Sequence, residues 1–280
     1  MPAPRDAAPI EHPVIIPGDP ASGVVLLCDH ASNSIPADYA SLGMPASELE
    51  RHIAYDIGIA GVTLRMAERL GCPAVLSTFS RLLIDPNRGE DDPTLVMRLS
   101  DGAVVPGNAR ADRAEVERRL ARFYRPYDRA VGAAVDEALA SGVPPAIVSM
   151  HSFTPAWKGV PRPWHVTVLW DADPRLPLPL IAALAADRAL VVGDNEPYDG
   201  ALAGDTINRH ATVRGLSNVL VEIRQDLIAT ATEQAEWGDR MAAALKSILA
   251  DPAQHRVERH PTRTASRHRA AFSPDPGPSI

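Results

Sequence analysis

Short apolar runs alternate with longer segments of helical periodicity along most of this chain. Such alternation predicts an α/β protein, a three-layer sandwich with a mixed, largely parallel central sheet. A continuous run such as Val24 to Cys28 is typical of a strand that is buried on both faces. The predicted strands cover residues 23–28, 74–78, 82–85, 146–150, 164–170, 190–192 and 219–223. The predicted helices cover residues 47–70, 112–140, 178–189 and 232–249.

Local signals mark the ends of two predicted helices. Ser47 is expected to cap the first helix, with Glu50 three residues later in the position of a capping box. Gly71 follows as a C-terminal stop. Pro126 interrupts the apolar periodicity of residues 112–140 and should kink or split that helix, because proline cannot donate the helical hydrogen bond.

The chain has 280 residues, of which 45% are hydrophobic and 22% are charged. This length fits one large domain or two small ones. Residues 1–20 are rich in proline and aperiodic, and we expect them to form an arm over the domain. Residues 251–280 are rich in arginine, histidine and proline, which predicts a flexible basic tail after a domain of residues 21–250.

The charge and the cysteine content exclude several classes of protein. The formal net charge is -7, which argues against nucleic acid as a partner. Neither a secretory signal nor an apolar run of roughly 20 residues is present, so no membrane partner is expected. Cys28 and Cys72 lie in apolar surroundings and are interpreted as reduced thiols of a cytoplasmic protein. The sequence carries no signal for the oligomeric state.

Polar side chains that could bind a ligand or take part in catalysis follow several of the predicted strands. His30, Asn87, His151 and Glu222 each lie at or just beyond the end of an apolar run. Ligands of α/β sheets gather at the carboxyl ends of the strands. We therefore interpret these four residues as parts of one site.

Two of these residues suggest a metal site. His30 and His151 follow different strands, and two imidazoles at neighbouring strand ends can share a zinc ion. Catalytic zinc usually has three protein ligands. Asp56, an acid in an otherwise apolar segment, and Asn33, three residues after His30, are the candidates for the third ligand. Asp29 could bind the metal itself or orient His30.

Glu222 is the candidate general base. It lies between the apolar residues Val221 and Ile223, and a partly desolvated carboxylate has a raised pKa that suits proton transfer. The alternative is a structural ion pair with Arg224. His210 lies in a polar loop before the last strand, where it could bind substrate or stabilise an oxyanion, or serve as an ordinary loop residue.

The Asn87–Arg88 pair is suited to binding a carboxylate, because the planar guanidinium donates two parallel hydrogen bonds. Arg81 could assist. These residues predict a small-molecule substrate that carries a carboxylate.

Several of these segments together resemble the N-formylglutamate amidohydrolase family. The likeness runs from about Val24 to Leu249 and is carried by residues 29–36, 52–58, 80–81, 85–89, 151–155 and 221–227. It implies the phosphorylase/hydrolase-like fold of zinc carboxypeptidases and aspartoacylases. It also implies zinc at His30 and His151, a substrate carboxylate at Asn87 and Arg88, and Glu222 as the base.

The chain departs from this pattern at one position. The glutamate of the H-x-x-E zinc motif is replaced by Asn33, and Asp56 is our preferred substitute. We expect a zinc-dependent hydrolase that cleaves an N-acyl amino acid such as N-formyl-L-glutamate. The alternatives are an amidase acting on peptide or cell-wall fragments, and an inactive relative that binds a metabolite.

Overall fold

A computed structural model describes residues 12–264 of the chain. Its centre is a seven-stranded sheet with the order β1-β3-β2-β6-β11-β9-β10. The strands are β1 Val14–Ile16, β2 Val24–Cys28, β3 Ala74–Leu76, β6 Ala146–Phe153, β9 Val166–Leu169, β10 Val192–Asp194 and β11 Asn218–Arg224. Two small hairpins pair β4 Leu99–Ser100 with β5 Ala103–Val104 and β7 Ala156–Trp157 with β8 Val160–Pro161.

Parallel pairs form the middle of the sheet. β3, β2, β6 and β11 are parallel neighbours, whereas β1 pairs with β3 and β9 pairs with β11 in the antiparallel direction. The sheet is therefore mixed and largely parallel, as predicted. The register between β11 and β6 places Glu222 opposite His151, so two of the predicted site residues are cross-strand neighbours.

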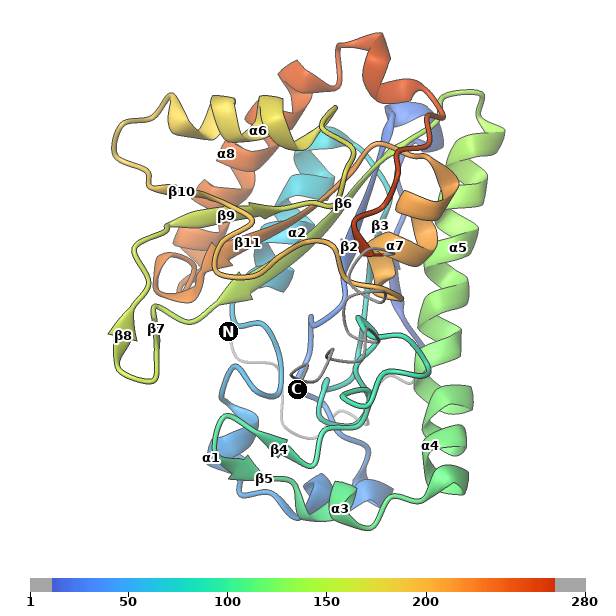
Figure 1. Cartoon of the computed structure of the whole chain (residues 1–280), viewed down its shortest axis with the longest axis vertical. Helices are drawn as coiled ribbons and strands as arrows, with labels where there is room; N and C mark the ends of the chain where they lie inside the picture. The colour runs from blue at the N-terminus through green and yellow to red at the C-terminus, as the bar shows by residue number, and fades with distance from the viewer. Residues whose placement is uncertain (1–11, 265–280) are drawn as a thin grey trace, which may run out of the picture.

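Helices cover both faces of the sheet and complete an α/β sandwich (Figure 1). α2 Ile59–Leu70, α6 Pro177–Ala185 and α8 Ala231–Ile248 pack on one face, where Val24, Leu26 and Cys28 of β2 point into their core. α5 Arg125–Ala140 packs on the other face against Val25 and Leu27. Burial of alternate β2 residues in two different cores explains the continuous apolar sequence of this strand.

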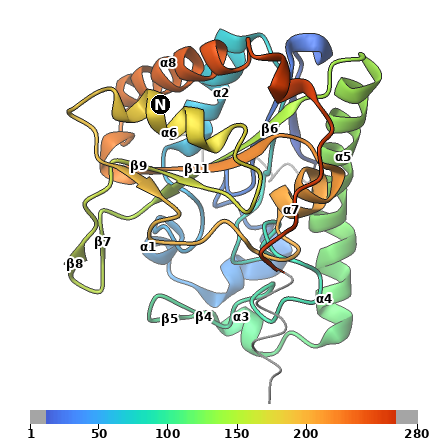
Figure 2. The same ribbon diagram turned by 45° about the horizontal axis from the view of Figure 1, so that its top comes forward.

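Shorter elements gather below the sheet in Figure 1 and remain together in the turned view of Figure 2. They comprise α1 Ala46–Leu49, α3 Pro106–Ala109 and the β4–β5 hairpin. α4 Arg113–Arg119 precedes α5, and the short α7 Thr206–His210 precedes β11. None of the helices among residues 12–264 is long and apolar enough to cross a bilayer.

The predicted helix over residues 47–70 is wrong in its first half. α1 ends at Leu49, its N-cap position is held by Pro45 rather than Ser47, and α2 begins only after Gly58, which has a φ of 81°. Between them, the backbone N–H of Asp56 donates to the carbonyl of His30 at 2.9 Å. This tertiary hydrogen bond keeps the segment out of a helix and places Asp56 beside His30.

The predicted strand over residues 82–85 is also absent. The Leu83 N–H donates to the Ser80 carbonyl in a turn. The carbonyls of Leu82 and Leu83 accept hydrogen bonds from the side chains of Asn108 and Arg119, at 2.7 and 2.8 Å. Because side chains satisfy these backbone groups, the segment can be buried without pairing in a sheet.

Pro126 divides the long helical region as predicted. α4 and α5 are joined by a π-helical turn over Leu120–Tyr124, and Pro126 lies in the first turn of α5. Because Pro126 has no N–H to donate to the preceding turn, it interrupts the hydrogen bonding of a helix that otherwise continues.

The ends of the described chain are more ordered than we predicted. Within the predicted arm, Val14–Ile16 form the edge strand β1, and residues 1–11 lie outside the described residues. Within the predicted tail, Gln254 is buried and donates to the Arg175 carbonyl at 2.6 Å, and Arg263 donates to Asp171. The tail prediction for residues 265–280 lies outside the part of the chain that the structure describes.

Candidate active site

A cavity of about 410 Å³ opens where β2, β6 and β11 end. Seven of the nine site residues predicted from the sequence line it: His30, Asp56, Arg81, Asn87, Arg88, His151 and Glu222. The fold therefore brings together residues from segments that are far apart in the sequence.

His30, Asp56 and His151 form a compact group in the wall of this cavity. All three are buried, and their candidate ligand atoms lie within 4.8 Å of one another. The Oδ2 atom of Asp56 is 3.4 Å from Nδ1 of His30 and 2.9 Å from Nδ1 of His151. The two imidazole rings meet edge to face, with 4.9 Å between centroids.

A carboxylate holds the far nitrogen of each imidazole. Nε2 of His30 is 2.7 Å from Asp85, and Nε2 of His151 is 3.0 Å from Asp29. Each imidazole is therefore oriented with Nδ1 toward Asp56. This is the arrangement in which carboxylates fix the tautomer and orientation of metal-binding histidines.

Asp29 is itself held by a buried hydrogen-bond network. Its two oxygens accept from the hydroxyl groups of Tyr127, Ser149 and Thr206 at 3.0, 2.8 and 2.8 Å. Burial alone would raise the pKa of Asp29, but the hydrogen bond from His151 and the two nearby imidazoles lower it well below its usual range. Asp29 is thus a fixed negative charge behind His151.

This donor set fits a zinc ion. Nδ1 of His30 is buried and has no hydrogen-bond partner, although polar atoms in such places are almost always paired. Burial disfavours a charged His151 ring, but hydrogen bonds to Asp29 and Asp56 raise its pKa to about 10. The pocket therefore stabilises a positive charge beside Asp56, and two imidazoles with one carboxylate are ligands that zinc prefers.

For a zinc ion held by His30, Asp56 and His151, Asp29→Asn should lower the affinity roughly 10–100-fold, the usual effect of removing a carboxylate that supports a metal-binding histidine. The amide keeps the shape of the side chain but removes the charge behind His151. Competition with a chromophoric chelator measures the affinity, and the exposed-surface variant Asp239→Asn serves as the control. Equal zinc affinity of both variants and the wild type would contradict the role of Asp29.

Glu222 projects into the same cavity from β11. Its Oε2 atom is buried and has no hydrogen-bond partner. Burial raises the pKa of this carboxyl to about 7, although the charge of His151 acts in the opposite direction. The alternative ion pair is not formed, because Arg224 pairs with Asp226 at 2.7 Å. The carboxylate is therefore available to a ligand.

The guanidinium groups of Arg81 and Arg88 differ in their surroundings. Arg81 forms an ion pair with Asp85 at 2.7 Å and lies 3.5 Å from Asp56. Arg88 instead donates to Thr94 and to the Asn87 carbonyl, and none of the described carboxylates lies within ion-pair distance of it. The side-chain oxygen of Asn87 accepts from the Thr206 N–H at 3.0 Å, which leaves its NH2 group for a ligand.

Two predicted site residues lie away from this cavity lining. The Asn33 amide donates to the Leu49 carbonyl at 2.9 Å, and Asn33 is not a member of the His30–Asp56–His151 group. His210 is paired with Asp128 of α5 at 2.7 Å. Of the two candidates for the third ligand, the structure thus places Asp56, and not Asn33, beside the histidines.

A family model describing N-formylglutamate amidohydrolase matches residues 22–229, well over half of the chain. The chain belongs to the N-formylglutamate amidohydrolase family. Family membership makes the protein an amidohydrolase, and the cavity described above is its candidate active site. Among proteins with curated functions, none matches the chain significantly.

Two solved structures share the fold of this amidohydrolase. A gene product of Agrobacterium tumefaciens is 35% identical, with a TM-score of 0.77 over 85% of this chain and 96% of that chain. An N-formylglutamate amidohydrolase from Ralstonia eutropha is 22% identical, with a TM-score of 0.65 over 86% of this chain and 98% of that one. The second likeness supports the fold alone.

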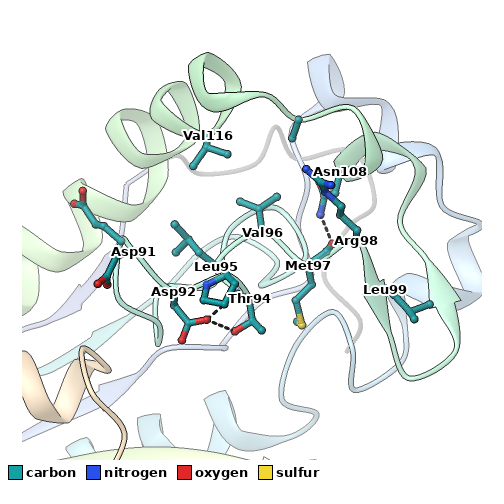
Figure 3. Close-up of a pocket in the computed structure, with 13 residues that line it drawn as sticks. Asp91, Asp92, Thr94, Leu95, Val96, Met97, Arg98, Leu99, Asn108 and Val116 are labelled. Carbon is teal, nitrogen blue, oxygen red and sulfur yellow. Dashed lines mark hydrogen bonds between the residues drawn. The ribbon is translucent and has the colours of Figure 1, made fainter. Parts of the chain in front are cut away.

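A second cavity of about 500 Å³ lies beyond the Arg88 loop (Figure 3). The segment from Glu90 to Leu99 lines much of it, and Asn108 donates to the Met97 carbonyl at its edge. Asp92 accepts a hydrogen bond from Thr94, the residue that also holds Arg88. None of His30, Asp56 and His151, the candidate metal-binding group, lines this cavity.

Sequence reasoning missed two residues that shape the active site. Asp85, which orients His30, lies in the Asn–Arg segment but had no assigned role there. Arg162 follows the β7–β8 hairpin and lines the cavity, although no strand end or family motif marks it. Asp29 was recognised, but it supports His151 rather than His30.

Proposed function

We propose that this amidohydrolase is a zinc enzyme that hydrolyses the amide bond of an N-acyl amino acid, with N-formyl-L-glutamate as the first candidate. One observation carries the proposal: three kinds of group line one cavity. Among the residues that the structure describes, they are the buried His30–Asp56–His151 group, Glu222 with an Oε2 atom that has no hydrogen-bond partner, and Arg88, whose guanidinium forms no ion pair. The formyl group and the glutamate are suggested by the family.

His30, Asp56 and His151 would hold the zinc. When bound, the ion would polarise the acyl carbonyl and make a water molecule a better nucleophile. Asp85 and Asp29 keep both imidazoles oriented for this role through their Nε2 atoms.

Glu222 transfers the proton in this proposal. Its unpartnered Oε2 atom accepts a proton from the attacking water, and the carboxyl then gives the proton to the nitrogen of the leaving amine. A pKa near 7 suits both directions of transfer, because the group can hold and release a proton at neutral pH.

Arg88 and Asn87 bind a substrate carboxylate in this proposal. A guanidinium in a cavity wall without an acidic partner is stabilised when a carboxylate binds. Arg81 is held by Asp85, so we assign it the role of keeping that carboxylate and His30 in place.

A hydrolysis screen tests the proposal. Purified protein with added zinc should release the amino acid from N-formyl substrates faster than from N-acetyl or N-succinyl substrates. Cleavage of peptide or cell-wall fragments instead would favour the amidase alternative. Absence of hydrolysis together with absence of bound metal would favour an inactive metabolite-binding protein.

Arg88→Lys should lower kcat/KM for the carboxylate substrate roughly 10-fold or more. Lysine keeps the charge but cannot form two parallel hydrogen bonds. The measurement compares an N-formyl amino acid with the analogue in which its carboxylate is a carboxamide. A wild-type enzyme that treats both compounds equally would show that the carboxylate is not recognised.

We also propose a cytoplasmic location, which is supported by two buried cysteines, Cys28 and Cys72, that form no disulfide. Cell fractionation tests it, with the protein expected in the cytoplasmic fraction.

A further inference from the structure

Arg162 is a second cationic group in the active-site cavity. It is the first residue after the β7–β8 hairpin, and it lines the same cavity as Arg88 and Glu222. Only 8% of its surface is exposed. Its guanidinium lies near three aromatic rings, at 5.7 Å from Phe153, 5.5 Å from Trp157 and 5.2 Å from Tyr198.

The guanidinium of Arg162 is held by neutral groups only. It donates to the Tyr198 hydroxyl at 2.6 Å and to the Thr154 hydroxyl at 3.2 Å. None of the carboxylates within residues 12–264 forms an ion pair with it. Arg81, which lines the same cavity, is instead paired with Asp85 at 2.7 Å.

The surrounding backbone fixes this cation in place. The Arg162 N–H donates to the Pro155 carbonyl at 2.8 Å, which closes the base of the hairpin. The Arg162 carbonyl accepts from Arg224 of β11 at 3.2 Å. Burial raises the pKa of Glu222 in the same cavity and the Arg162 charge acts to lower it, but the two groups form no ion pair. A buried charge without a directly paired carboxylate is costly for folding, and aromatic rings offset only part of that cost. Such a rigid cation is typical of a site that receives an anion.

We infer that Arg162 binds a second carboxylate of the substrate, distinct from the one bound by Arg88. The inference rests on the proposed function and deepens it, because it assigns the second carboxylate of a substrate such as N-formyl-L-glutamate to a named residue in a different part of the cavity from Arg88. Arg162 is thus a specificity-determining residue. A substrate that lacks this carboxylate would leave the buried guanidinium without its charged partner, which is costly.

Three substrates and two variants test this assignment. The substrates are N-formyl-L-glutamate and its two monoamides, one at the side-chain carboxyl and one at the α-carboxyl. The variants are Arg162→Met and Arg88→Met, and Arg240→Met is the matched control. Arg240 also lies over an aromatic ring, at 5.4 Å from Trp237, but on α8 at the surface.

Wild-type and control enzymes should prefer the diacid to both monoamides. Arg162→Met should lower kcat/KM for the diacid roughly 100-fold, the usual effect of removing one partner of a buried charge pair. The Arg162→Met enzyme should no longer prefer the diacid over one of the two monoamides, but should still prefer it over the other. Arg88→Met should lose the preference over the other monoamide instead. Arg162→Lys keeps the charge and should retain part of the preference for the diacid. This variant keeps the test valid if the methionine variant folds poorly.

Two results would overturn the inference. Arg162→Met could lower kcat/KM for all three substrates by the same factor, or it could remove discrimination at the carboxylate that Arg88 recognises. If the wild type hydrolyses none of the substrates, the proposed function fails and calorimetry tests Arg162 separately. Wild type should then bind glutarate more tightly than glutaric monoamide, Arg162→Met should not, and equal preference in both proteins would contradict the inference.

Discussion

Replacing Glu222 with glutamine should lower kcat by about 100-fold or more while leaving the zinc content unchanged. The amide keeps the size of the side chain and its place opposite His151, but it can no longer accept a proton from water. Proton transfer by a positioned side chain contributes roughly 10²–10⁴-fold to enzymatic rates, which sets the size of the expected loss. Steady-state hydrolysis and elemental analysis of the same preparation provide both readouts.

The matched control for this variant is Glu236→Gln on the exposed side of α8. It makes the same chemical change far from the cavity and should leave kcat unaltered. Undiminished turnover of Glu222→Gln would return Glu222 to a structural role. A fall in zinc content equal to the fall in turnover would show that the residue acts through the metal site instead.

Asp56→Asn is expected to have the other large effect, a loss of zinc affinity of roughly 100-fold or more together with loss of hydrolysis. Removal of a residue that only supports a ligand usually costs 10–100-fold, and removal of a charged ligand should cost at least as much. The nearly identical shape of asparagine keeps the packing around His30 and His151. Competition with a chromophoric chelator measures the affinity, and excess zinc should restore part of the activity.

Asn33→Ala separates the two candidates for the third ligand. The Asn33 amide is bonded to the Leu49 carbonyl and lies outside the His–Asp–His group, so its removal should leave zinc affinity unchanged. If Asn33→Ala released the zinc while Asp56→Asn retained it, the assignment of the third ligand would have to be reversed.

The sequence was most informative about the central strands. β2, β6 and β11 are buried on both faces, so their apolar runs are visible without any knowledge of the fold, and the polar residue after each run marks the active-site edge. The resemblance to a family indicated in addition that these segments contribute to the same active site. For this reason His30, His151 and Glu222 were predicted and lie in one cavity.

The failures share a physical cause, which is side-chain and tertiary hydrogen bonding of the backbone. Residues 50–58 have an apolar pattern that suits a helix, but the hydrogen bond from the Asp56 N–H to the His30 carbonyl holds them beside His30 and His151. Residues 82–85 have the composition of a strand, but Asn108 and Arg119 satisfy their carbonyls. Such partners are distant in sequence, and no local pattern reveals them.

Charge pairing within the cavity was likewise invisible in the sequence. In the sequence, both Arg81 and Arg88 are candidates for binding a carboxylate, and only the structure shows that Asp85 forms an ion pair with Arg81 and not with Arg88. Arg162 comes from a hairpin without any motif and completes the set.

The most direct test of the central claim is metal content and activity measured on one preparation of the wild-type protein. We expect about one zinc ion per chain. Complete removal of the metal by a chelator should abolish hydrolysis of N-formyl amino acids, and added zinc should restore it. Undiminished hydrolysis by protein shown to be free of metal would contradict the assignment of His30, Asp56 and His151 as a catalytic zinc site.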